Sequence, residues 1–168
     1  MKKYVALFLA MTMMFALCAC GSAVNNKTPE KLIESYLTAV KDRDYEAIWN
    51  MLPKEIQDYA IREDYINNKD EGVNYIRRAI KEDLVFASLD LPSCKTFSFR
   101  IVERYPGDEY SQEYYDEEGV RLTIDGDEFI KAVITADGKE QEAWFWVIKV
   151  KNAWYLTSAT GNDTIFEA

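Results

Sequence analysis

Between residues 28 and 83 the apolar positions recur every three or four residues, which is the spacing of helices with one buried face. Thr28-Pro29-Glu30 marks a helix start, because the threonine hydroxyl can cap and proline suits the first helical position. We expect a second helix capped by Asp44 and ending near Pro53, a third over residues 54–61, and a fourth ending near Asp83. The inward residues expected on the first and fourth helices are Leu32, Ile33, Tyr36, Leu37, Val40, Val73, Ile76, Ala79, Ile80 and Leu84.

From residue 97 the apolar period changes to two, which is typical of half-buried strands. Strands are expected in "TFSFRIVERY", over residues 128–135, over residues 139–150 and in "AWYLTS". Asp137-Gly138 predicts a tight hairpin turn with positive φ at both positions, and Lys151-Asn152 predicts a second turn. Between the strands, residues 107–120 are expected to form a short helix, with Tyr110, Tyr114 and Glu118 on one face and Gly119 as its cap.

Helices followed by strands joined through hairpins predict an α+β domain, in which the N-terminal helices pack on one face of a curved antiparallel sheet. The segment that carries these elements, residues 28–168, has the length of one domain, and no repeat or low-complexity stretch divides it.

The first residues have the pattern of an export signal. Lys2 and Lys3 precede a thirteen-residue apolar run, Val5 to Leu17, and we expect residues 1–19 to be a signal peptide. An uncleaved transmembrane anchor is the alternative, because no charge occurs from Tyr4 to Val24.

Leu17-Cys18-Ala19-Cys20 resembles the lipobox of bacterial lipoproteins. The resemblance implies that the sulfur of Cys20 carries a diacylglyceryl group and that the chain is cut between Ala19 and Cys20. Two acyl chains give stable anchoring to a bilayer. The expected location is the extracytoplasmic face of the cell membrane, with residues 20–27 as a short lipidated tether.

The charge of the chain limits its partners. With 20 basic and 29 acidic residues the formal net charge is −9, and no basic patch with interleaved aromatic residues occurs. Such a chain repels nucleic acid, so we expect no nucleic-acid partner.

The residue types also limit the chemistry. The chain contains no histidine, which excludes Ser-His-Asp and Cys-His catalysis and histidine-ligated zinc. Cys94 has no partner for a cysteine-rich zinc site, and the seven glycines form no phosphate loop. We therefore assign no catalytic residue, metal or cofactor; pairs of carboxylates and tyrosines are the remaining route to acid–base catalysis.

Both ends of the domain resemble nuclear transport factor 2-like domains. Residues 28–53, "TPEKLIESYLTAVKDRDYEAIWNMLP", match their opening pair of helices, and "VIKVKNAWYLTS" matches their closing hairpin. The resemblance implies a cone, in which a curved sheet wraps the helices and leaves a cavity. Single-domain lipoproteins of this type occur in Gram-positive bacteria, and the fold serves enzymes, ligand binders and interaction modules alike.

The aromatic residues are the best indication of a binding site. Trp144, Trp146, Ile148 and Val150 share one strand face and Phe145 and Val147 the other, so one face packs on helices and the second needs a cover. That cover can be a second copy, another envelope protein or the insert over residues 105–125. The aromatic residues expected to line the cone mouth are Tyr36, Trp49, Tyr59 and Trp154. We expect a non-catalytic binding module at the cell envelope; the alternatives are a small-molecule site in the cone and an Asp/Tyr enzyme.

Overall fold

The structure, a computed structural model, describes residues 24–62, 66–107, 112–115 and 121–159. The expected signal peptide, 1–19, and the expected lipidation site, Cys20, lie outside these residues. In the described ranges, no helix has both the length and the apolar character needed to cross a membrane.

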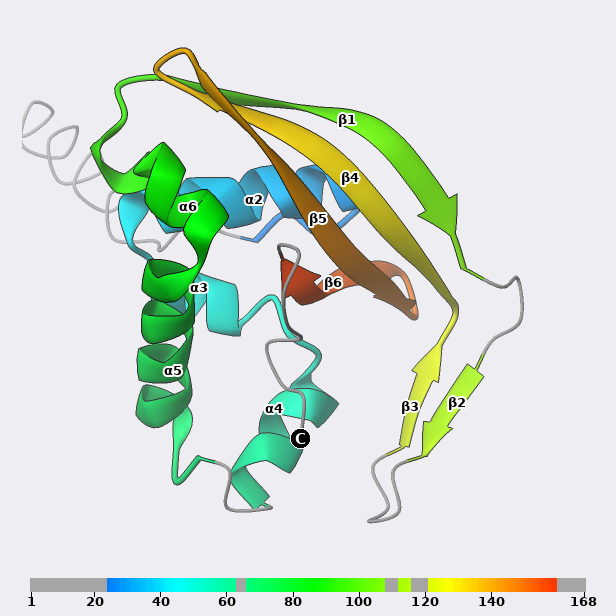
Figure 1. The fold of residues 1–168 in the computed structure, drawn as a ribbon. Coiled ribbons are helices and arrows are strands. Elements are labelled where there is room, and N and C mark those ends of the chain that lie inside the picture. Colours follow the sequence, from blue (N-terminus) through cyan, green and yellow to red (C-terminus); the bar gives the residue numbers. More distant parts are fainter. Residues whose placement is uncertain (1–23, 63–65, 108–111, 116–120, 160–168) are drawn as a thin grey trace, which may run out of the picture.

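The first half of the chain forms helices, as its periodicity predicts (Figure 1). Their bounds are α2 Pro29–Asp42, α3 Tyr45–Trp49, α4 Lys54–Arg62, α5 Lys69–Glu82 and α6 Leu84–Leu89, followed by a 3-10 turn, η1, over Leu91–Ser93.

Both predicted caps at the start of the domain are confirmed. Thr28 Oγ1 accepts a hydrogen bond from the backbone nitrogen of Lys31 at 3.3 Å, and Asp44 Oδ1 accepts one from that of Ala47 at 3.0 Å. These oxygens satisfy amide groups that a helix start leaves without partners. Between the two helices, Arg43 closes α2 with a left-handed backbone, φ 59°.

The fourth helix ends where predicted, but the chain after it differs from the expectation. Asp83 leaves helical geometry and caps a new helix, α6, by accepting hydrogen bonds from the amides of Val85 and Phe86. This change of direction turns Leu84, expected on the buried face of the fourth helix, into solvent, where it is 81% exposed.

The second half forms a curved antiparallel sheet in the order β1-β4-β5-β6. The strands are β1 Phe97–Pro106, β4 Gly126–Ala136, β5 Lys139–Val150 and β6 Ala153–Ala159. Asp137 and Gly138 both have positive φ, 46° and 82°, which confirms the predicted hairpin turn. Lys151, at the second predicted turn, has φ 57°.

The helix expected over residues 107–120 is wrong where the structure describes this segment. Gln112–Tyr115 is a strand, β2, which pairs antiparallel with β3, Arg121–Ile124. Pairing with the next strand along the chain outweighs the helical spacing of the acidic and tyrosine residues, because strand preference depends on cross-strand neighbours that the periodicity of the segment itself does not contain. Tyr110, Glu118 and Gly119 of the expected helix lie outside the described residues.

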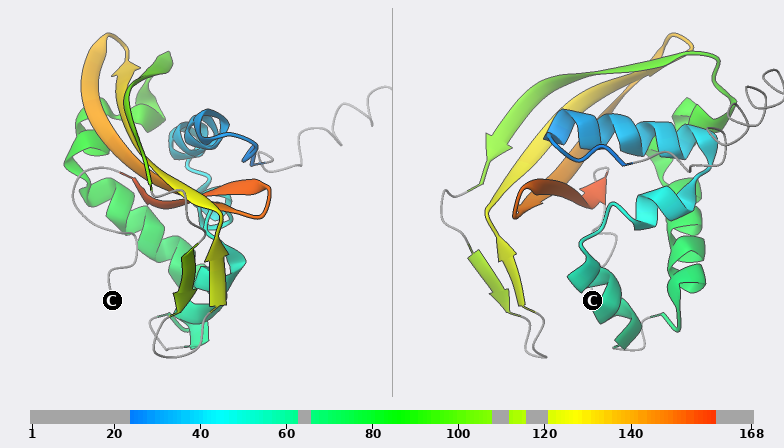
Figure 2. Two further views of the ribbon diagram at one scale, coloured as in Figure 1. Left: turned by 90° about the vertical axis from the view of Figure 1, so that its right-hand side faces the viewer. Right: turned by 180° about the vertical axis from the view of Figure 1, so that it is seen from behind.

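The sheet curves around α2, which lies inside its arch (Figures 1 and 2). Core side chains of α2, such as Leu32, Ile33 and Leu37, are fully buried with Ile130 and Phe145 of the sheet. Arg104 of β1 forms ion pairs with Glu30 of α2 and Glu128 of β4 and so joins the helix to two strands. The predicted α+β class, with helices packed on a curved antiparallel sheet, is confirmed, and at this coarse level it is consistent with the expected cone.

Residues 24–27, assigned to the tether from the sequence, lie against the domain. The backbone nitrogen of Asn25 donates to Ser35 Oγ at 3.2 Å, and that of Trp154 donates to the carbonyl of Asn26 at 2.8 Å. The partly buried side chain of Val24 packs against the core. The domain therefore begins a few residues before Thr28.

Candidate functional site

The outer face of the sheet carries a group of aromatic side chains. Strand register places Tyr105 opposite Phe129, Phe129 opposite Trp146, and Lys131 opposite Trp144. Cross-strand partners point to the same side of a sheet, so these residues share one face. We call Tyr105, Phe129, Trp144 and Trp146 the aromatic face.

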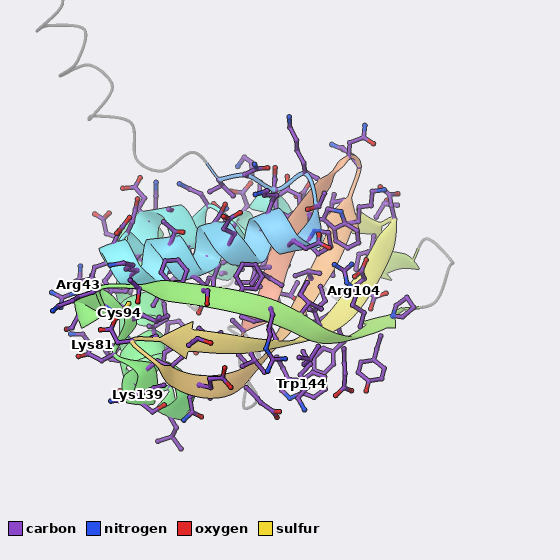
Figure 3. The ribbon with its side chains drawn as sticks, turned by 90° about the horizontal axis from the view of Figure 1, so that it is seen from above. Arg43, Lys81, Cys94, Arg104, Lys139 and Trp144 are labelled. Carbon is purple, nitrogen blue, oxygen red and sulfur yellow. The ribbon has the colours of Figure 1, made fainter. Side chains whose placement is uncertain are left out.

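The opposite side of β5 packs on the helices, as expected for one of its two faces. Phe145 and Val147 are fully buried in the main core, where the Phe145 ring meets Tyr36 of α2 edge-on at 6.0 Å between centroids. Trp144 and Trp146 therefore belong to the face that needs a cover. Figure 3 shows Trp144 on the side of the sheet away from α2.

The rings of the aromatic face stack on one another. Phe129 and Trp144 have centroids 4.9 Å apart with 20° between their planes, and Tyr105 stacks on Trp144 at 6.1 Å with 29°. Lys131 Nζ lies 5.4 Å from the Trp144 centroid, over the ring. Such stacked and cation–π contacts are individually weak but orient the rings.

Polar partners hold the edges of the aromatic face. The indole nitrogen of Trp146 donates to Asp127 Oδ2 at 3.3 Å, and the Tyr105 hydroxyl donates to Glu103. Lys131 Nζ lies 2.9 Å from Glu142 and 3.6 Å from Glu103. The hydrogen bond from Tyr105, together with Lys131, lowers the pKa of Glu103, so this carboxylate is charged at neutral pH.

The aromatic face is open to solvent over much of its area. Tyr105 is 51% exposed, Phe129 44% and Trp146 36%, while Trp144 between them is half-buried. Among the described residues six large hydrophobic side chains are exposed, and four of them lie on β1, β4 and β5, Val102 being the fourth. Tyr105, Phe129 and Trp146 are cross-strand neighbours and not scattered, so they indicate an interaction surface.

The described part of the insert covers the far end of this face, where Ile148 and Val150 lie. Ile148 and Val150 of β5 are buried in a small cluster with Leu122 of β3, against which Ile124 and Ile56 pack. One of the three expected covers, the insert over residues 105–125, is therefore confirmed for that end. It leaves Trp146 and Phe129 exposed.

The aromatic residues expected at the cone mouth have a different role. Tyr36 and Trp49 are 2% and 1% exposed, so they belong to the core and line no mouth. Tyr36 meets the rings of Phe86 and Phe145 edge-on, and burial, with Asp83 nearby, raises the pKa of its phenol. Tyr59 and Trp154 are half-buried, and Trp154 packs against the core. The local pattern marks these residues as inward-facing but cannot say whether a cavity remains beside them.

Two clefts lie elsewhere on the helical side. One of about 560 Å³ is bordered by residues of α2, α5 and α6, and another of about 230 Å³ lies beside residues 25–51. None of the six aromatic residues singled out from the sequence lines either cleft. Within the described ranges, no group of three or more acidic or cysteine side chains is placed to hold a metal ion.

Two members of the aromatic face were missed in the sequence. Tyr105 alternates with Glu103 at the end of its strand, and Phe129 follows the acidic segment 125–128, so neither pattern distinguishes them from ordinary strand residues.

No protein-family model, curated protein or solved structure matches the chain.

Proposed function

We propose that this protein is a lipid-anchored extracytoplasmic binding module, which binds another protein of the cell envelope through the aromatic face and catalyses no reaction. The observation that carries the proposal is the contiguous exposure of Tyr105, Phe129 and Trp146 beside the stacked ring of Trp144. Aromatic residues with apolar bodies and polar tips are the residue types most enriched at protein interfaces.

The arrangement of the rings favours a protein over a flat ligand. Phe129, Tyr105 and Lys131 already lie against the ring of Trp144, so this half-buried ring is engaged by three neighbours within the chain. A planar ligand or sugar ring needs a free aromatic face on which to stack, whereas apolar side chains of a protein can pack between ring edges. The aromatic face therefore suits a partner that presents apolar side chains.

The charges around the aromatic face favour a cationic partner over a second copy of this chain. Asp127, Glu103 and Glu142 border the rings, and Lys131 lies between the last two. Two copies packed on this face would bring like charges together, in a chain whose net charge is −9. The partner that fits presents apolar side chains flanked by lysine or arginine.

The proposed lipid anchor would leave the aromatic face accessible to such a partner. Four residues from Cys20 to Val24 span at most about 14 Å, and residues 25 and 26 are bonded to α2 and β6. The outer face of the sheet lies on the side away from these residues (Figure 2). A lipid on Cys20 would hold the α2 side near the bilayer and leave the aromatic face open to other proteins.

Site-specific photo-crosslinking tests the proposal in cells of the native host. The full-length chain carries benzoylphenylalanine in place of Phe129 or of Trp146, and the matched control carries it in place of Tyr75, which is 39% exposed on α5. We expect the same envelope protein to be crosslinked from both test positions and not from Tyr75. The adduct is identified by mass spectrometry, and its surface should be basic as well as apolar.

Two outcomes would refute the proposal. One is an absence of any adduct above the Tyr75 control, and the other is an adduct between two copies of this chain. A Phe129→Ser variant separates binding from folding: its side chain is 44% exposed but stacks on Trp144, so the melting temperature should fall by only a few degrees while the adduct at Trp146 is lost.

A further inference from the structure

The cleft of about 560 Å³ lies at the end of the molecule where α2 stops beside α5 and α6. Figure 3 shows Arg43 and Lys81 together at this end, far from Trp144. Its volume is in the range that small-molecule sites occupy. The residues that border it are Val40, Arg43, Tyr45, Arg77, Ile80, Lys81, Phe86, Ala87, Asp90 and Pro92.

Positive charge is concentrated at this cleft although the chain as a whole is acidic. Arg43, Arg77 and Lys81 border it, with Asp90 as the opposing charge. Among the described residues none of the three cations forms an ion pair, whereas Lys54, Lys69 and Lys131 elsewhere do. Arg77 instead lies over the ring of Tyr45, 5.3 Å from its centroid.

The walls between these charges are apolar. Val40 and Phe86 are buried at 1% and 4% exposure, and Ile80 is half-buried beside them. A cleft that joins apolar walls to a few convergent charged groups is the usual composition of a small-molecule site.

The backbone at the cleft is also unusual. Arg43 and Asp90 have left-handed backbones, with φ 59° and 45°, at positions where helix ends favour glycine. In the described ranges the other non-glycine residues with positive φ are Asp137 and Lys151, and both lie at hairpin turns. Non-glycine residues in such conformations cluster at functional sites.

The attraction of cations to helix C-termini explains only part of this arrangement. Lys81 lies in the last turn of α5 and Arg43 follows the end of α2, where the helix dipole favours positive charge. Arg77 lies more than a turn before the end of α5 and points over Tyr45, so the dipole does not explain its place.

We propose that this cleft binds an organic anion. Its charged group, a carboxylate, phosphate or sulfonate, lies among Arg43, Arg77 and Lys81, and its apolar body lies against Val40, Ile80 and Phe86. The site is built from helices on the side of the molecule away from the aromatic face, so it is independent of the protein-binding function proposed above.

Fluorescence titration with 1-anilinonaphthalene-8-sulfonate tests this site, because the dye joins an anionic group to an apolar body. The neutral control is N-phenyl-1-naphthylamine, which lacks only the sulfonate. We expect the sulfonate dye to bind and the neutral dye to bind at least about tenfold more weakly, since charge-assisted hydrogen bonds are lost.

A matched pair of variants locates the binding. Arg43→Asn and Lys151→Asn each remove one positive charge from a left-handed position, φ 59° and 57°, but only the first lies at the cleft. We expect Arg43→Asn to weaken dye binding about tenfold and Lys151→Asn to leave it unchanged. Lys81→Gln, in an exposed helical position, is expected to weaken it similarly and serves if Arg43→Asn fails to fold.

Three results would overturn the proposal. They are equal binding of the two dyes, equal effects of Arg43→Asn and Lys151→Asn, and loss of dye binding in Trp146→Ser, which would place the dye on the aromatic face. Competition with inorganic phosphate shows whether the ligand needs an apolar body as well as a charge. Displacement of the dye only by a large molar excess of phosphate supports an organic anion. Displacement at equimolar phosphate contradicts it.

Discussion

Gly72 of α5, the helix that carries two of the three cleft cations, lies against Trp49 of α3. A Cβ atom added there would lie 2.4 Å from Trp49 Cζ3 and 2.8 and 2.9 Å from two more atoms of the same ring. Trp49 is 1% exposed, so its ring has no open space into which it could withdraw. We therefore expect Gly72→Ala to destabilise the domain, although glycine is ordinarily a poor residue in a helix.

The magnitude follows from two opposing effects. Replacing glycine by alanine in a helix contributes up to about 1 kcal/mol through propensity and chain entropy. Forcing an extra methyl group into a closed core costs about 1–3 kcal/mol, and the upper part of that range applies because three ring atoms of Trp49 lie inside normal contact distance. The net loss of unfolding free energy should be about 1–2 kcal/mol, or roughly 2–8 °C in melting temperature.

Urea and thermal unfolding, followed by circular dichroism, measure this loss. Gly126→Ala is the matched control, because nothing lies within 4 Å of the position that its Cβ would occupy, and its stability should be unchanged or slightly raised. Trp49→Leu removes the ring that causes the clash, so Gly72→Ala should become neutral or stabilising in that background. The reasoning is refuted if Gly72→Ala alone preserves stability, or if its cost persists beside Leu at position 49.

Two further predictions concern the start of β1 and the anchor. Asp137 accepts hydrogen bonds from the amides of Thr96 and Lys95 at 3.0–3.1 Å, and these bonds lower its pKa in the folded protein. The stabilisation is therefore complete above the unfolded-state pKa, near 3.9, and is lost as the pH falls through the lower folded value. Asp137→Asn should melt below the unsubstituted protein at pH 7, with the gap narrowing below about pH 4; a gap that stays constant down to pH 2 would contradict this. Cys20→Ser should abolish acylation of the chain, because acyl attachment requires the thiol, so a radioactive fatty acid should label the unsubstituted protein in host cells and not this variant. Absence of label from the unsubstituted protein would argue for the uncleaved anchor.

Elements whose determinants lie close together in the chain could be predicted. The first helix is specified within a few residues, by the cap at Thr28, the proline after it and the apolar face that follows. The β4–β5 hairpin is specified equally locally, by Asp137-Gly138 between two alternating segments. The strand that replaced the expected helix over residues 107–120 shows the limit: its pairing with β3 is also close in the chain, but the residues between the two strands carry no turn pair such as Asp137-Gly138, and the spacing of the tyrosines also suits a helix.

Part of the candidate site could be predicted, because the alternation of side chains along a strand depends on residues close in the chain. Alternation along β5 places Trp144 and Trp146 on one face and Phe145 on the other, since successive strand residues point to opposite sides. Both faces of β5 are apolar, however, so the alternation does not say which of them meets the helices. It also does not show that Tyr36 and Trp49 would be closed off inside the core, because both would have the same inward spacing beside an open cavity.

The sequence by itself determined the class of the fold, the hairpin turns at Asp137-Gly138 and Lys151-Asn152, its acidity and the absence of histidine chemistry, because each of these depends on composition or on residues close in the chain. Only the tertiary structure decided which aromatic rings remain exposed and which cations meet. Arg43 follows the end of α2, Arg77 and Lys81 belong to α5, and up to 38 positions separate them, so no local pattern groups them. Their proximity arises when α5 docks on α3 through Gly72, a contact made by burial and shape, which act between residues distant in the chain.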